Sequence, residues 1–423
     1  MDDSSASHVH DRSRLTDHLS VGVLTRTVPR FIVDEVLAET GRREKRSRLL
    51  PAHVVVYFVM ALALFRDGYD EVMRNLVHGL RFARTWSHGW QVPRTSAMSQ
   101  ARVRLGEAAM KELFARVAVP VAIAGTPGAW LGRWRLMAID GVMLDIPETE
   151  ANLAVYDKPA GGTRRPYPQV KIVGLGEAGT HAVIDAEIGS IRHGERDLAE
   201  ALTRSLSPDM LVVADRGFFS YQLWRTYLLC GAALLWRLSK TTQLPVLQVL
   251  PDGSYLSEIK NVKGPGKARI ALDRVADPML ATHIPVRVIE YQIDTGEGTI
   301  GPETFRLITT ILNPAEADAH TLAATYAQRW EFESSLREIE CQLLEPGSTL
   351  RSKTPEMVRQ EIWGLFLTHY AIRAFMTQAA DTIDLDPDRL STIRAINIVR
   401  RSVTDPAGFS PRSTKTATPP GDH

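Results

Sequence analysis

The pattern of apolar and polar positions divides the chain into a helical first third, a strand-rich middle and a helical end. Apolar residues recur every three or four positions over 23–39, 69–82 and 95–106, which predicts helices. From residue 134 onward the pattern changes to short apolar runs bounded by turn residues, which predicts strands. The sequence therefore predicts an α/β fold with an N-terminal helical domain.

Two of the predicted strands end in an aspartate. Residues 135–139 lead to Asp140, and residues 210–214 lead to Asp215. An Asp followed by Gly after a strand is an ordinary turn signal. At the tip of a central strand, however, a carboxylate is also well placed to bind a metal ion. Asp145 lies five residues after Asp140 and is an alternative to it.

Further strands are predicted on both sides of Asp215. Residues 174–179 match the glycine pattern of dinucleotide-binding loops, but a strand follows them where that fold requires a helix. We therefore interpret them as a hairpin loop between strands 169–174 and 181–188. An all-β block is predicted at about 240–312, with strands at 245–250, 268–275, 284–294 and 305–312.

A helix is predicted over residues 326–340, and it carries two stripes. Its buried face comprises Phe332, Leu336, Ile339 and Leu343. Its polar face comprises Tyr326, Arg329, Glu333, Arg337 and Glu340, which fall within an arc of roughly 80°. Ion pairs at i,i+4 often decorate exposed helices. A phenol, two guanidinium groups and a carboxylate on one narrow face also suit a site that binds a metal ion and phosphate oxygens.

Composition and charge add a nucleic-acid partner to this picture. Hydrophobic residues make up 44% of the chain and charged residues 23%, as in soluble globular proteins. The first 20 residues are polar and show no signal peptide, which predicts a cytoplasmic protein. Residues 1–135 hold 20 Lys/Arg and 13 Asp/Glu, whereas the remainder holds 30 and 36. This basic first part predicts DNA contact, with residues 42–48 and, on helix 95–106, Ser99, Gln100, Arg102 and Arg104 as candidates. The alternatives are a solvated charge run at 42–48 and a helical bundle without a groove-reading helix.

These residues resemble a known family. The segment Tyr-Ala-Gln-Arg-Trp-Glu-Phe-Glu, which ends at Glu333, matches the first part of the Tyr-Arg-Glu-Lys signature of the insertion-sequence-four family of DDE transposases. Asp215 with Arg216 is similar to the second catalytic acid of that family. The Lys of the signature falls seven residues after the Glu, where this chain has Glu340. Arg337, one turn earlier, is a candidate for the cationic role.

The resemblance implies a ribonuclease H-like mixed-sheet catalytic core with an all-β insertion. It implies that Asp140, Asp215 and Glu333 are the catalytic, metal-binding triad. Three oxygen donors suit Mg²⁺, with Mn²⁺ as a substitute, and two such ions would clamp an in-line phosphoryl displacement. Contacts to DNA phosphates are expected from Tyr326, Arg329, Arg216 and Arg337.

The function implied is cut-and-paste movement of an insertion sequence, by cleavage at terminal inverted repeats and strand transfer to target DNA. The expected partners are double-stranded DNA and a second copy of the chain, as a homodimer on paired ends, at the bacterial nucleoid. Two alternatives stay open: a catalytically impaired transposase that only binds DNA, and a two-metal nuclease that does not join strands. The predicted organisation is a disordered segment at 1–20, a helical DNA-binding domain at 21–130, the catalytic core at 131–345, a C-terminal helical region at 346–410 and a disordered tail at 411–423.

Overall fold

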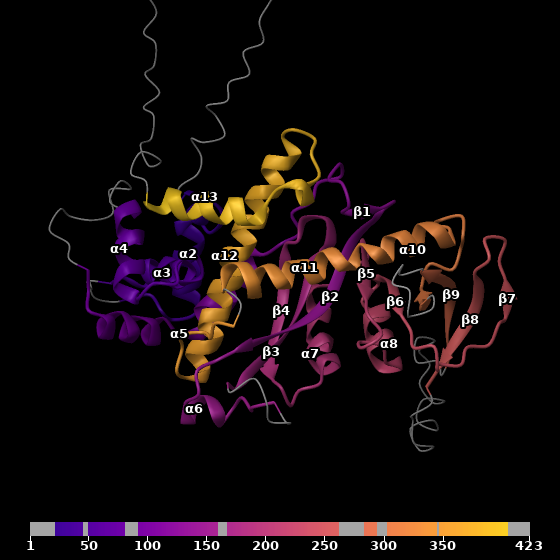
Figure 1. The fold of residues 1–423 in the computed structure, drawn as a ribbon, viewed down its shortest axis with the longest axis horizontal. Helices are drawn as coiled ribbons and strands as arrows, with labels where there is room; N and C mark the ends of the chain where they lie inside the picture. Colours follow the sequence, from indigo (N-terminus) through magenta and orange to yellow (C-terminus); the bar gives the residue numbers. More distant parts are fainter. Residues whose placement is uncertain are drawn as a thin grey trace, which may run out of the picture.

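A mixed β-sheet with helices on both faces forms the centre of the computed structural model, and a group of helices flanks it at one end (Figure 1). The structure describes residues 22–44, 50–80, 92–159, 167–261, 283–293, 303–344 and 347–404. The segments predicted to be disordered, 1–20 and 411–423, lie outside the described residues, as does the strand predicted at 268–275.

The helices lie before, between and after the strands of the sheet. The α-helices are α1 (Gly22–Thr27), α2 (Arg30–Glu39), α3 (Ala52–Leu64), α4 (Tyr69–Leu80), α5 (Thr95–Val117), α6 (Glu150–Leu153), α7 (Glu195–Ala201), α8 (Tyr221–Leu229), α10 (Ala319–Ala327), α11 (Arg329–Glu338), α12 (Pro355–Asp381) and α13 (Thr392–Thr404). Short 3₁₀ or π segments are η2 (Ala178–Thr180), η3 (Leu202–Ser205), η5 (Ile339–Leu343) and η6 (Pro387–Arg389).

The described strands form one sheet in the order β4-β3-β2-β5-β6-β10-β9-β8-β7, with β1 paired to β2. They are β1 (Trp130–Leu131), β2 (Trp134–Asp145), β3 (Gln169–Glu177), β4 (Val183–Ser190), β5 (Met210–Ala214), β6 (Ala233–Arg237), β7 (Gln248–Val249), β8 (Tyr255–Lys260), β9 (His283–Ile293) and β10 (Glu303–Thr309). β2 runs antiparallel to β3 and parallel to β5, which in turn runs parallel to β6. This mixed order agrees with the predicted ribonuclease H-like core.

The predicted β insertion continues the core sheet instead of forming a layer of its own. β10 pairs antiparallel with β6, and β9, β8 and β7 follow outward from it. The strands predicted at 284–294 and 305–312 are confirmed as β9 and β10. β8 was not predicted, because its sequence mixes polar and apolar residues on both faces.

Proline and glycine shape the N-terminal helices. Pro29 divides the helix predicted over 23–39 into α1 and α2, because a proline ring supplies no backbone N–H. The helix predicted to stop at Gly106 continues as α5 to Val117, but with a kink. Gly106 has φ +72°, a left-handed conformation that glycine adopts without steric cost.

One apolar core joins the N-terminal helices, α12, α13 and the face of β2 beneath α11. Within it, every residue of α3 from Val54 to Leu64 is buried. The two helical regions predicted as separate domains therefore share a core, and their boundaries stay predictions. No single helix in the described part of the chain is long and apolar enough to cross a membrane, although one sharply bent pair, Ala52–Leu64 with Tyr69–Leu76, passes by length and composition.

Arg102, a predicted DNA contact on α5, is instead a buried structural residue. Its guanidinium donates hydrogen bonds to Gln360 Oε1 at 2.9 Å and to Ser352 Oγ at 2.9 Å. These bonds tie α5 to α12 and to the segment before it. Ser99 and Gln100, on the same helix, are exposed as predicted.

Glycines in β3 allow α11 to approach the sheet closely. A Cβ atom added at Gly176 would overlap the ring of Phe332 on α11. The hairpin between β3 and β4 is confirmed, with its turn at Ala178–Thr180, but Gly174 and Gly176 lie in the strand and not in the loop. The glycine pattern thus serves the packing of the helix that carries Glu333.

Candidate active site

The register of two parallel strands places Asp140 and Asp215 side by side. Ile139 of β2 lies opposite Ala214 of β5, so the next residue on each strand is an aspartate at the same level of the sheet. Neighbouring strands lie about 4.8 Å apart. The two acids therefore lie side by side where the parallel pairing of β2 with β5 ends. The prediction that the first strand ends at Asp140 was wrong, because β2 continues to Asp145 in its pairing with β3.

Asp145, the alternative to Asp140, lies away from this position. It is five residues further along β2, or about 16 Å at the usual rise of a strand. Its Oδ1 accepts a hydrogen bond from Gln169 Nε2 at 2.7 Å, on the neighbouring strand β3. The geometry favours Asp140 as the partner of Asp215.

The third acid, Glu333, is carried by helices that cross one face of the sheet (Figure 1). The helix predicted over 326–340 is divided into α10 and α11 at Gln328, and it widens into a π-helix from Ile339. Its apolar stripe is buried as predicted, at Phe332, Leu336, Ile339 and Leu343.

Arg329 lies between two of the three acids. Its Nη1 is 3.8 Å from Asp140 Oδ2, and its Nη2 is 3.8 Å from Glu333 Oε2. The remaining acid, Asp215, accepts a hydrogen bond at 3.2 Å from the hydroxyl of Tyr326. The structure thus brings the three predicted acids, Tyr326 and Arg329 together in one set of charged and polar contacts.

Two members of the predicted polar stripe are buried, contrary to what a surface stripe would show. Tyr326 is 1% exposed and Arg329 is 6% exposed. The ring of Tyr326 packs edge-on against Phe305 of β10, and the Arg329 guanidinium lies 4.7 Å from the centre of the Trp330 ring. The Nε atom of Arg329 is buried and has no hydrogen-bond partner among the described residues.

The other predicted phosphate contacts, Arg216 and Arg337, lie at the surface. The Arg337 side chain is 70% exposed, with Nη2 3.7 Å from Glu333 Oε1. Arg216 is exposed in the loop after Asp215. Glu340, at the position of the family lysine, is half-buried in the π-helix.

The sequence analysis missed Arg237, which lies beside Asp215. β6 pairs with β5 so that Trp236 is opposite Ala214, and Arg237 therefore follows at the level of Asp215. Its Nη1 is 3.7 Å from Asp215 Oδ1, and its guanidinium lies 3.9 Å from the centre of the Phe305 ring. The strand-end argument that singled out Asp215 would also have found Arg237, at the end of the next strand.

Two residues of α7, Glu195 and Arg196, reach the same edge from the other face and were also missed. Arg196 Nε donates a hydrogen bond at 2.8 Å to the carbonyl of Gly217, two residues after Asp215. Glu195 Oε1 lies 3.2 Å from the place that a Cβ on Gly141 would take. No local motif marks either residue, since only the packing of α7 on the sheet brings them here.

The electrostatics of the set act most clearly on Asp140. Burial raises the pKa of Asp140 above its usual value, and repulsion from Glu333 and Glu195 adds to the rise. The Gly141 N–H, 2.8 Å from Asp140 Oδ1, and the charge of Arg329 oppose it. Crowded carboxylates of this kind favour the binding of a cation.

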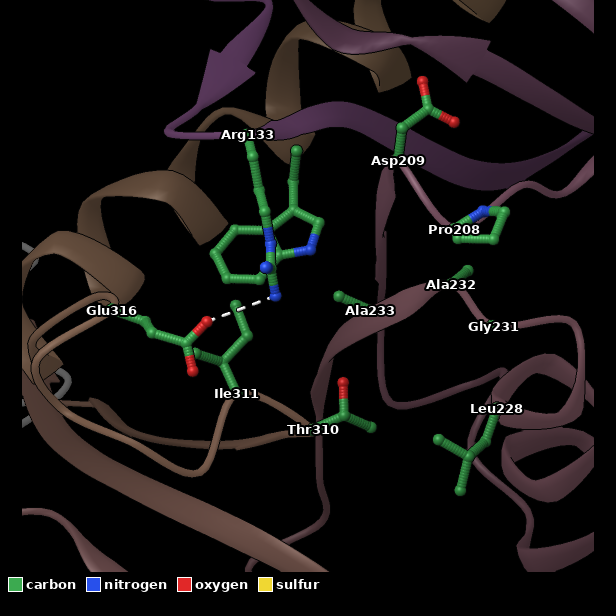
Figure 2. Close-up of a pocket in the computed structure, with 11 residues that line it drawn as sticks. Arg133, Pro208, Asp209, Leu228, Gly231, Ala232, Ala233, Thr310, Ile311 and Glu316 are labelled. Atoms are coloured by element: carbon green, nitrogen blue, oxygen red, sulfur yellow. Dashed lines mark hydrogen bonds and ion pairs between the residues drawn. The ribbon is translucent and has the colours of Figure 1, made fainter.

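A cavity of about 650 Å³ lies at the opposite ends of the same strands (Figure 2). Its lining includes Trp134 at the start of β2 and Ala233 at the start of β6. Arg133 and Glu316 form an ion pair at 3.2 Å within it. None of its lining residues belongs to the acid set, so we do not assign the cavity to the site.

Comparison with known families decides what kind of site this is. Residues 18–115 match the family "Insertion element 4 transposase N-terminal", and residues 134–370 match the family "Transposase DDE domain". The second match spans more than half of the chain and includes all three acids. The chain belongs to the DDE transposases. The first match places it in the insertion-sequence-four branch, as the sequence predicted.

This transposase is similar to two proteins of Escherichia coli (strain K12). It is 29% identical over 384 residues to the transposase InsG for insertion sequence element IS4, which covers 90% of this chain and 82% of InsG. It is 24% identical over 242 residues to the putative transposase InsZ, which covers 56% of this chain and 75% of InsZ.

A solved structure of the piggyBac transposase, in a synaptic complex with hairpin DNA, is also similar to this transposase. The TM-score is 0.48 and the identity 12%, over 95% of this chain and 84% of that chain. Because this score is low, the fold assignment rests on the family match and the strand order.

Family membership makes this chain a DNA-cleaving transposase that depends on a divalent metal ion. The predicted family, the ribonuclease H-like fold and the transposase function are therefore confirmed. Nothing in the comparisons favours a protein that only binds DNA. The individual site residues, the identity of the metal, the two-metal mechanism and the homodimer stay predictions.

Proposed function

We propose that this transposase moves its insertion sequence by a cut-and-paste reaction, with Asp140, Asp215 and Glu333 as the catalytic triad. It would cleave at the terminal inverted repeats and join the freed ends to target DNA. The observation that carries the proposal is the strand register, which sets two acids side by side, with the third beside them on α11.

The donor set fits Mg²⁺, with Mn²⁺ as a substitute. Three carboxylates from three separate elements offer hard oxygen ligands and leave positions for water and phosphate oxygens. When bound, two such ions would stabilise the attacking and leaving oxygens of an in-line phosphoryl transfer. No three His, Cys, Asp or Glu side chains in the described ranges are already gathered around one point. The Arg329 guanidinium instead lies between Asp140 and Glu333 and contacts both carboxylates. Ion binding therefore requires this guanidinium to turn away.

Tyr326 and Arg329 are the proposed contacts to the phosphate at the cleaved end. The buried Nε of Arg329 has a hydrogen to donate and no acceptor among the described residues. A phosphate oxygen would satisfy it, because guanidinium groups bind phosphate through paired N–H donors. Arg216 and Arg337, which are exposed at the rim, would bind the backbone further along the DNA.

The proposed number of copies in the assembly follows from the cut-and-paste reaction. A reaction that cuts two ends and joins them to one target is served by two copies of the chain, so we propose a homodimer on paired ends. Such an enzyme would act on chromosomal DNA, in the cytoplasm at the nucleoid.

The test is cleavage of end-labelled DNA that carries the inverted repeats flanking the gene, with Mg²⁺, Mn²⁺ or EDTA. The wild type and the control D145N, from the same strand as Asp140, should nick the DNA at the repeat boundary when metal is present. D140N and E333A should bind the DNA and leave it uncut.

The other outcomes are equally informative. Binding without any cut, in wild type as well as variants, would identify an impaired transposase, and E340K would then test whether the missing lysine is the cause. Cleavage without joined products would point to a nuclease. Cleavage by D140N at the wild-type rate would contradict the triad.

A further inference from the structure

We propose that Glu195 is a fourth carboxylate of the active site, which helps to hold the divalent cation from the α7 side of β2. The proposal rests on the proposed function of Asp140 as a metal ligand. It assigns a role to a residue that lies outside the Asp-Asp-Glu triad.

The position of the Glu195 carboxylate is set by a glycine. Its Oε1 lies 3.2 Å, and its Cδ 3.5 Å, from the place that a Cβ on Gly141 would take. A side chain at residue 141 would therefore crowd the carboxylate. The lack of a side chain there lets Glu195 rest against the backbone immediately after Asp140.

Helix α7 is held firmly in this place. Leu198 and Ala199 are buried in the apolar cluster on the face of the sheet opposite α11. The side chain of Asp197 accepts a hydrogen bond from the Gly194 N–H at 3.3 Å, which caps the start of the helix. Arg196 then fastens α7 to the loop after Asp215 through the Gly217 carbonyl. Glu195 is thus carried on an element bonded to the loop that follows Asp215, and its carboxylate rests against the strand of Asp140.

Glu195 differs from the other acids of the site because it has no counterion within the described part of the chain. Asp140 and Glu333 share Arg329, and Asp215 lies near Arg237. The half-buried carboxylate of Glu195 has no hydrogen bond or ion pair with any described residue.

A half-buried carboxylate with no counterion among the described residues is unfavourable unless a ligand supplies the positive charge. In this transposase the divalent ion supplies it. Glu195 would bind the ion directly or through one of its waters, and it would keep that water oriented for the reaction. No additional reactant is needed, because the ion is already part of the family's chemistry.

The experiment measures Mn²⁺ affinity without DNA, from the signal of free Mn²⁺ in electron paramagnetic resonance, for the full-length wild type, E195Q, D140N and E200Q. Glu200 is the matched control, since it is exposed on the same helix. E195Q should weaken Mn²⁺ binding by about tenfold, as loss of a supporting ligand does in other metal sites. E200Q should bind as the wild type does.

A second readout separates this role from a structural one. In EDTA, E195Q should unfold at the wild-type temperature or above it, because an uncompensated charge is removed, and it should gain less stability from Mn²⁺. A lower unfolding temperature in EDTA, with unchanged Mn²⁺ affinity, would show that Glu195 is merely structural. If E195Q does not fold, E195D is used in its place. It keeps the negative charge, but its side chain is one methylene shorter, so the carboxylate lies further from the site. E195D should then bind Mn²⁺ more weakly than wild type.

Failure of this proposal is distinguishable from failure of the triad. If D140N loses Mn²⁺ affinity and E195Q does not, Glu195 is not a ligand and the triad stands. If D140N also binds Mn²⁺ as the wild type does, the triad itself is wrong, and the role of Glu195 is overturned with it.

Discussion

Two of the glutamates of helix α11, Glu333 and Glu338, lie five residues apart and differ in how fully the protein binds their carboxylates. The Glu333 side chain is 35% exposed, and its nearest cations, Arg329 and Arg337, are 3.8 and 3.7 Å away. The Glu338 side chain is 9% exposed and accepts a hydrogen bond from Thr392 at 2.7 Å. The same helix therefore bears one loosely held acid and one that is fully enclosed.

Glu338 lies in a buried network that joins α11 to α12 and to the end of the chain. His369 Nε2 is 3.1 Å from Glu338 Oε2, and Arg373 Nη1 is 3.5 Å from Oε1. Burial alone would raise the pKa of Glu338, but His181, His369 and Arg373 outweigh it and hold the pKa well below its usual value.

The difference shows how a structural acid is told from a functional one. A buried carboxylate that has hydrogen bonds with histidine and threonine and lies 3.5 Å from a buried arginine is satisfied within the protein, so it fixes the helix. A carboxylate with only long contacts, beside other acids, keeps its lone pairs for a ligand. Substitution of either glutamate should change mainly chemistry or mainly stability, whereas a substitution that disturbs the packing of α11 on β3 should change both.

The largest effect is expected for Glu333→Gln. Cleavage of repeat-bearing DNA should fall on the order of 10³-fold, the scale for a group that acts on charge in the transition state. The free energy of unfolding should change by less than about 1 kcal/mol, because its ion pairs are long and partly exposed. Single-turnover cleavage and urea unfolding measure the two quantities. A large loss of stability would show that Glu333 is a structural residue, as Glu338 is, and would contradict this prediction.

Glu338→Ala should give the reverse pattern. Removing one partner of a buried charge network costs about 3–5 kcal/mol. Arg373 is left buried with only Asp388 Oδ1, 3.5 Å away, as a carboxylate partner. The measurement is the free energy of unfolding from urea titrations. Cleavage by the fraction that stays folded should be near the wild-type rate. A specific loss of chemistry in fully folded protein would break the comparison.

The packing of α11 on β3 can be tested at Gly176. Gly176→Ala places a methyl group against the Phe332 ring, and such overpacking costs about 1–3 kcal/mol. It should also slow cleavage, because Phe332 adjoins Glu333 on α11. The double variant G176A/F332L should recover part of both losses. Additive losses in the double variant would show that the two residues do not share this contact.

A change of pH should have a smaller effect on the free energy of unfolding. The folded-state pKa of Glu338 lies below its unfolded value of about 4.5, so its stabilisation is present above that pH and is lost as the pH falls. As the pH falls below about 4.5, the free energy of unfolding should therefore decrease less steeply in Glu338→Ala than in wild type. Asp140 has the opposite sign, because its pKa is raised. Its ionisation therefore disfavours the fold as the pH rises, and D140N should be more stable than wild type at pH 7, by up to about 1 kcal/mol. Equal stability of D140N and wild type across this range would contradict that sign.

Sequence reasoning found those parts of the site that follow from local pattern. Asp140 and Asp215 could be paired in advance, because the ends of parallel strands meet at one edge of a sheet. Glu333 was found through its helix and its signature. The burial of Tyr326 and Arg329 was not foreseen, because periodicity shows which residues share a face but not what covers that face.

Residues that depend on tertiary packing were missed or misjudged. Glu195 and Glu338 have no local signal, since their neighbours come from distant strands and helices. Arg102 resembles a DNA contact in sequence, yet it is enclosed by α12. Gly176 belongs to a pattern that predicts a loop, whereas its role is to make room for Phe332.

The most direct test of the central claim, that Asp140, Asp215 and Glu333 bind the catalytic ion, is a change of metal with a changed ligand. Asp215→Cys replaces a hard oxygen ligand by a softer thiolate, which Mn²⁺ accepts better than Mg²⁺ does. We predict that D215C cleaves repeat-bearing DNA with Mn²⁺ and not with Mg²⁺, while wild type cleaves with both. Equal loss of cleavage in both metals, in a folded protein that still binds DNA, would contradict the account.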